Sequence, residues 1–112
     1  MDIEILSSLE KPDLFEKFRR QVYKDFEMAG VSSFTPKIDS TNLEEIQQAF
    51  YQSILKLDVG NALKNLIYRI DISENQIKKA SLEYPKEALQ FILAELMIKR
   101  ILQKVILKEL HS

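Results

Sequence analysis

The stretch that decides the fold is Pro85–Leu110, PKEALQFILAELMIKRILQKVILKEL. Apolar residues recur through it without a glycine or a second proline, which predicts one α-helix of about 26 residues. Proline fits the first turn of a helix and pushes the residue before it out of helical geometry, so we expect the helix to begin at Pro85. At 1.5 Å per residue it would be about 39 Å long, longer than a small domain is wide.

Two halves of this predicted helix differ in character. Residues 88–98 are apolar nearly all round, with Gln90 and Glu95 as exceptions, and such a helix is buried on several sides. Lysine and arginine return in residues 99–110, yet apolar side chains still cover more than half of the circumference. We expect one copy of the chain to cover the first half only, so that a second copy or another protein covers the rest. The residues predicted for this interface are Ile98, Ile101, Leu102, Val105, Ile106 and Leu110.

Composition fits one all-α domain over residues 1–112. The chain is 46% hydrophobic and 29% charged, a balance typical of a folded protein, and its two glycines and three prolines favour a few long elements over many strands. We expect a bundle of four or five helices. Residues 1–11 carry too short a pattern to separate an arm from a short helix, and residues 31–40 are expected to form an internal loop.

Local signals predict the bounds of the earlier helices. A first helix is expected from Pro12 to a C-cap at Gly30. Thr41 and Glu44 have the spacing of a capping box for a second helix, which should end near Leu57. Gly60 is costly inside a helix and predicts a break over residues 58–61.

The segment Leu63–Leu82, LKNLIYRIDISENQIKKASL, has the rhythm of a helix-turn-helix corner. Asp71 falls at the left-handed turn position, and Ser73 with Gln76 has the form of a capping box, with Ile72 and Ile77 as a hydrophobic staple. Arg69 could pair with Asp71 across the corner or reach an acid elsewhere. If the corner binds DNA, the side chains that would reach bases and phosphates are Asn75, Gln76, Lys78 and Lys79.

Residue types needed for common catalytic and metal sites are missing. There is no cysteine, and the one histidine, His111, is next to the last residue of the sequence. Acidic pairs such as Glu44–Glu45 lack the spacing of a known ligand motif, and no glycine-rich phosphate loop occurs. We therefore expect a protein that is not an enzyme and uses no cofactor or metal.

Charge and hydropathy narrow the class of partner. A formal net charge of −1, from 16 basic and 17 acidic residues, disfavours a strongly basic nucleic-acid binder. No apolar run approaches a membrane span, and the first residues lack the pattern of a secretory signal, so we expect a cytoplasmic protein. The function expected from the sequence is a small helical protein-interaction module that forms homo-oligomers, such as a dimer, through residues 85–110; the alternative is DNA binding through residues 63–82.

Overall fold

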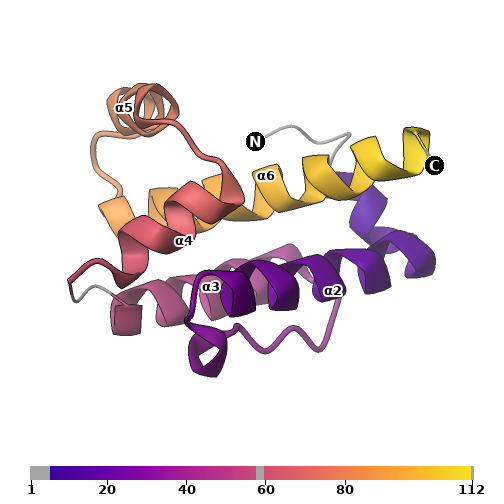
Figure 1. The fold of residues 1–112 in the computed structure, drawn as a ribbon. Helices are drawn as coiled ribbons and strands as arrows, with labels where there is room; N and C mark the ends of the chain where they lie inside the picture. Colours follow the sequence, from indigo (N-terminus) through magenta and orange to yellow (C-terminus); the bar gives the residue numbers. More distant parts are fainter. Residues whose placement is uncertain (1–5, 58–59, 112) are drawn as a thin grey trace.

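The computed structural model describes residues 6–57 and 60–111. It confirms the all-α prediction: five α-helices form a bundle in this part of the chain (Figure 1). The elements are η1 (Ser8–Glu10), α2 (Pro12–Met28), η2 (Ser32–Phe34), α3 (Leu43–Leu57), α4 (Ala62–Ile70), α5 (Glu74–Glu83) and α6 (Leu89–Leu110).

Helix α6 is the central element of the bundle. It contacts α2, α3, α4 and α5, and in Figure 1 α2 and α3 run on one side of it while α5 lies on the other. Its 22 residues give a length of about 33 Å, close to the 35 Å long axis of the molecule. The helix therefore spans the bundle without projecting far beyond it.

The core lies where α2, α3 and α6 meet. Phe50 of α3 packs against Phe18 and Phe26 of α2, with ring centroids 6.4 and 6.2 Å apart. From α6 the core takes a row of fully buried side chains: Ala94, Met97, Ile98, Ile101 and Leu102. Side chains from the connecting segments complete it, because Leu9, Val31, Ile38 and Ile72 are buried too.

The start of α6 differs from the prediction. Pro85 lies in a turn, where the Glu87 amide donates to the Tyr84 carbonyl at 3.1 Å, and the helix begins four residues later at Leu89. Proline's fixed φ suits the second position of a turn as well as the first turn of a helix, so the residue alone does not separate the two. Ala88, the residue before the helix, has extended backbone and provides no side-chain cap.

The start of α3 is displaced by one residue from the predicted cap. Asn42, not Thr41, caps this helix: its side-chain Oδ1 accepts from the Glu45 amide at 3.0 Å. Asparagine is among the strongest N-cap residues, and it outcompetes the threonine before it. Ser40 supports the same turn, because its hydroxyl accepts from the Asn42 amide at 3.1 Å and donates to the Glu45 carboxylate.

The ends of α2 and α4 share one geometry, the Schellman motif. Gly30 (φ +78°) follows α2, with the Val31 amide donating to the Phe26 carbonyl; Asp71 (φ +73°) follows α4, with the Ile72 amide donating to the Ile67 carbonyl. The predicted C-cap at Gly30 and the predicted left-handed Asp71 are thus confirmed. Aspartate tolerates this conformation better than most residues with a Cβ atom.

The other boundaries agree with the sequence. Helix α3 ends at Leu57, Gly60 has a left-handed φ of +68° and α4 begins at Ala62; residues 58 and 59 of the predicted break lie outside the described residues. Residues 31–40 connect α2 to α3 as an internal segment. For residues 1–11, the described part is helical from residue 6 to residue 10.

The capping box at the start of α5 is present in full. The Gln76 amide donates to the Ser73 hydroxyl at 3.1 Å, and the Ser73 amide donates to the Gln76 side chain at 2.9 Å. Ile72 is buried and Ile77 partly buried against the core, as the staple requires.

We predict that Ser73→Ala lowers the free energy of unfolding by about 0.5 to 2 kcal/mol. The Gln76 amide loses its acceptor, and the Gln76 side chain that accepts from the residue 73 amide is held less firmly. Urea denaturation followed by circular dichroism measures this change. Ser33→Ala, at an exposed serine of η2, is the control and should stay within about 0.5 kcal/mol of the parent chain. Equal losses in the two variants would contradict a role for the cap.

Candidate functional site

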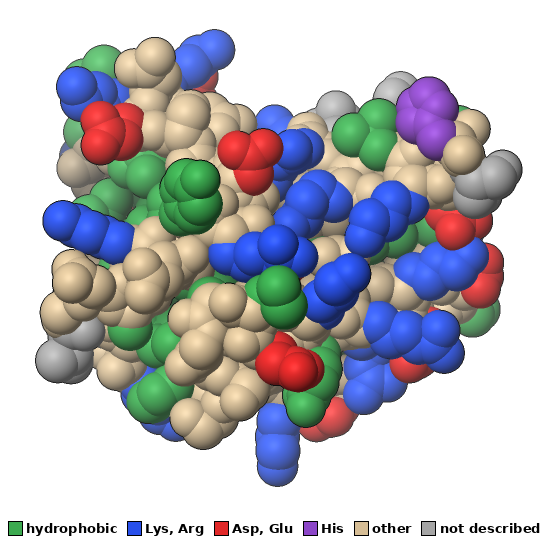
Figure 2. All heavy atoms as spheres, in the orientation of Figure 1, with side chains coloured by type: hydrophobic (Ala, Val, Ile, Leu, Met, Phe, Trp, Pro, Cys, Tyr) green, Lys and Arg blue, Asp and Glu red, His purple; other side chains and the backbone are tan. Residues whose placement is uncertain are grey.

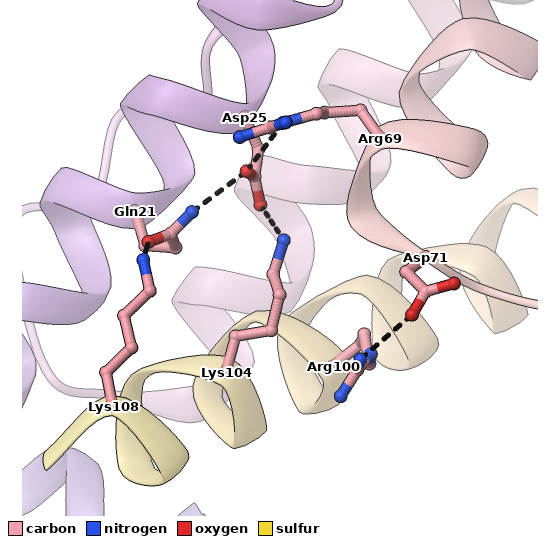
Figure 3. A network of polar contacts seen from close by, with 7 residues as sticks. All are labelled: Gln21, Asp25, Arg69, Asp71, Arg100, Lys104 and Lys108. Carbon is pink, nitrogen blue, oxygen red and sulfur yellow. Dashed lines mark hydrogen bonds and ion pairs between the residues drawn. The ribbon is translucent and has the colours of Figure 1, made fainter. Parts of the chain in front are cut away.

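Asp25 is the most buried charged side chain of the described residues, with 0% exposure. Helix α2 brings it inward because residue 25 lies seven residues after Phe18 and three after Val22, on the stripe that faces α6. Figure 3 shows its carboxylate between side chains from α2, α4 and α6. A buried carboxylate without partners would cost far more than the bundle's net stability, so these contacts are obligatory.

Three side chains surround the Asp25 carboxylate. Lys104 of α6 donates to Oδ2 at 2.7 Å, and Gln21, one turn earlier on α2, donates to Oδ1 at 2.9 Å. The Nε atom of Arg69, on α4, lies 3.4 Å from Oδ1. This Nε is buried and makes no hydrogen bond among the described residues, so Arg69 contributes mainly through its charge. Arg69 thus reaches an acid elsewhere and does not pair with Asp71.

The polar chain continues outward through Gln21. Its side-chain carbonyl accepts from the Lys108 ammonium at 2.7 Å, while its amide group donates to Asp25. Gln21 is itself buried, with 7% exposure. The sequence of contacts Lys104–Asp25–Gln21–Lys108 therefore fixes two lysines of α6 against one side of α2.

A second ion pair anchors the helix-turn-helix corner. Arg100 of α6 donates to the Asp71 carboxylate at 3.0 Å, so the residue with left-handed backbone also ties the corner to the central helix (Figure 3). Asp71 is largely exposed, and surface pairs of this kind contribute up to about 1 kcal/mol. The corner is oriented mostly by the burial of Ile70 and Ile72.

The four residues predicted to contact DNA are all exposed, and two of them face the neighbouring helix α6 across a cavity. Gln76 and Lys79 line an open cavity between α5 and α6, and Gln76 is occupied in the capping box. Asn75 and Lys78 are exposed without lining that cavity. The acids Glu74 and Glu83, at the two ends of α5, offset the charge of its lysines.

Most of the predicted interface is buried within one copy of the chain. Ile98, Ile101 and Leu102 have 0% exposure and Val105 has 4%, so the expectation that one copy could not cover them is wrong. The helices α2, α3, α4 and α5 of the same chain all contact α6 and supply this cover. Ile106 is partly buried, and Leu110 is 73% exposed together with Leu107 at 48%.

The carboxyl group of Glu95, beside α5, has a raised pKa. Partial burial raises the pKa of Glu95 above its ordinary value of 4.5, and the nearby Glu87 raises it further. Gln47 of α3 donates to the Glu95 carboxylate at 3.3 Å. Glu83 and Tyr84 lie with Glu95 along the cleft between α5 and α6.

A metal site requires at least three ligating side chains close together. In residues 6–57 and 60–111, His, Asp and Glu side chains form no such group. None of the helices described combines the length and the apolar character needed to cross a membrane. Comparison of the chain with protein-family models, with curated proteins and with solved structures finds no match.

We predict that Asp25→Asn lowers the free energy of unfolding by about 3 kcal/mol, because the amide cannot neutralise Lys104 and Arg69. Chemical denaturation measures the loss, and Asp39→Asn, at an exposed aspartate, is the matched control. A loss below about 0.5 kcal/mol for Asp25→Asn would show that the buried network does not stabilise the fold.

We predict that Glu95→Gln raises the melting temperature at pH 7 and leaves it nearly unchanged at about pH 4. A raised pKa means that the folded state favours the protonated carboxyl, so stability falls as pH rises from 4.5 through the raised pKa. Glutamine stays neutral and can still accept from Gln47. Thermal melts at both pH values test this, with Glu27→Gln as the exposed control; a difference independent of pH would contradict it.

Proposed function

We propose that the chain is a small non-enzymatic helical interaction module that self-associates through the last turns of α6. The observation that carries the proposal is the exposure of Leu107 and Leu110, two leucines three residues apart on the element around which the fold is built. The partly buried Ile106 lies beside them.

Helix α5 defines where this surface begins. At 100° per residue, Leu96, Gln103, Leu107 and Leu110 lie within about 60° of one another on α6. Leu96 and Gln103 line the cavity shared with α5, whereas Leu107 and Leu110 follow beyond it. Helix α5 thus lies over this stripe near Leu96 and Gln103, whereas near Leu107 and Leu110 the stripe is open to a partner.

A second copy of the chain fits such a stripe. In a twofold contact the same residues meet from both copies, so two leucines per chain become a four-leucine contact. Full burial of a leucine contributes roughly 1.5 to 3 kcal/mol, and scaling by the observed exposures gives about 4 to 7 kcal/mol for the four side chains. Part of this gain offsets the translational and rotational freedom lost on association, so we expect a weak dimer, in the micromolar to millimolar range at best.

DNA binding through Leu63–Leu82 has one observation in its favour, the left-handed Asp71 between α4 and α5. Charge argues against it, because Asp71, Glu74 and Glu83 flank the lysines of α5. Gln76, a candidate for reading adenine, is held by the Ser73 amide. Self-association therefore has the better support.

We predict a concentration-dependent monomer–dimer equilibrium in sedimentation equilibrium between about 10 μM and 1 mM. Replacing both leucines, as Leu107→Lys with Leu110→Lys, should leave a monomer, because four ammonium groups would face one another in the dimer. Leu82→Lys is the control, since Leu82 is 82% exposed on α5 and outside the stripe. A parent chain that stays monomeric to about 1 mM, or a control that dissociates equally, would overturn the proposal.

A further inference from the structure

A cleft between α2 and α6 gathers cationic side chains on the side of α6 away from Leu107 and Leu110, which we call the leucine stripe. Its volume is about 180 Å³. Lysine and arginine side chains gather on the face of the molecule over these two helices (Figure 2). The lining residues are Lys17, Arg20, Gln21, Lys24, Val105, Lys108 and Glu109.

The charges in this cleft are unbalanced. Four cations and one carboxylate line it, a formal net charge of +3. Glu109 forms an ion pair with Lys17. The pKa of Lys17 is raised because its ammonium donates to both Glu109 and Asp13. Arg20 has only a 3.9 Å contact with Glu16 at the surface.

Two of the cations have no carboxylate partner among the described residues. Lys24 and Lys108 form no ion pair with any acid of the described residues. Lys24 stands four residues after Arg20 and seven after Lys17, so one side of α2 presents all three. Lys108 approaches from α6.

The position of Lys108 is set from inside the molecule. Gln21 accepts from its ammonium at 2.7 Å and is buried against Asp25, so a neutral oxygen holds the cation in place without neutralising it. Val105, with 4% exposure, forms an apolar part of the lining, where charge interactions are screened less than in open water. A cation held in advance loses less entropy when it binds an anion.

We propose that this cleft is a binding site for a phosphoryl group, as carried by a small phosphate compound or by a lipid headgroup. A doubly charged tetrahedral anion can accept from Arg20, Lys24 and Lys108 together, whereas a single carboxylate has one charge and two oxygens to offer. The volume is below that of a typical drug-sized pocket, which favours a compact group over an extended chain.

The test is a titration of the full chain with inorganic pyrophosphate, followed by two-dimensional ¹H–¹⁵N NMR. We expect shifts of amides in α2 and in the last turns of α6, with affinity that falls as salt is added. Lys24→Gln with Lys108→Gln should weaken binding by roughly tenfold or more, since two charge-assisted hydrogen bonds are lost. Lys64→Gln with Lys78→Gln removes two exposed lysines on α4 and α5 and should bind like the parent chain.

Two further arms identify the source and the class of the anion. Flotation with phosphatidylcholine vesicles, with and without a phosphoinositide, detects a lipid headgroup; retention on the phosphoinositide vesicles alone, lost in Lys24→Gln with Lys108→Gln, would assign the phosphoryl group to lipid. Citrate is the carboxylate competitor. Binding of citrate as tight as that of pyrophosphate, equal weakening in the control variant, or no response to pyrophosphate or to the vesicles would overturn the proposal. Because the leucine stripe is unchanged in these variants, the monomer–dimer equilibrium is scored separately.

Discussion

A carboxylate that water cannot reach must find its partners inside the protein, and Asp25 takes them from three helices. Lys104 and Arg69 neutralise it, and Gln21 donates to the oxygen that faces Arg69. These contacts specify how α2, α4 and α6 lie along one another, which apolar packing alone leaves less defined. A shift of α6 by one turn would move Lys104 by about 5.4 Å and leave the carboxylate unpaired. The need to pair Asp25 therefore also sets where the neighbouring side chains lie at the surface.

The way in which α6 is covered shows what a helix wheel leaves out. The wheel indicates correctly that most sides of α6 are apolar, but it contains no information about how closely the other helices pack around those sides. In the structure α2, α3, α4 and α5 all contact α6. These four helices of one copy therefore cover more of α6 than its apolar circumference indicates. What remains exposed is a short stripe, which reduces the expected interface without removing it.

Features with local causes could be predicted from the sequence, and features with distant causes could not. The Ser73 capping box and the left-handed Asp71 depend on a few neighbouring residues, so their pattern specifies them. The two cationic partners of Asp25 lie 44 and 79 positions away, and nothing in the sequence pairs them with it. A signal was nevertheless present: Asp25 falls on the apolar stripe of its helix, and an acid at such a position needs a partner. Pro85 and Thr41 show a different limit. Pro85 fits a turn as well as the first turn of a helix, and Thr41 stands next to Asn42, which can cap the same helix.

The buried network and the basic cleft are two ends of one arrangement. Had residue 21 been an acid, Lys108 would be neutralised and Asp25 would meet a second negative charge. Glutamine avoids both outcomes, since its amide group satisfies Asp25 while its carbonyl holds Lys108. The same side chain therefore completes the interior and holds at the surface a cation that has no carboxylate partner among the described residues. Stability alone requires only the first of these. The need to bury Asp25 does not explain why Lys24 and Lys108 line the cleft without a carboxylate partner among the described residues. Binding of an anion there would account for it, and the leucine stripe on another side of α6 would stay free for a second copy.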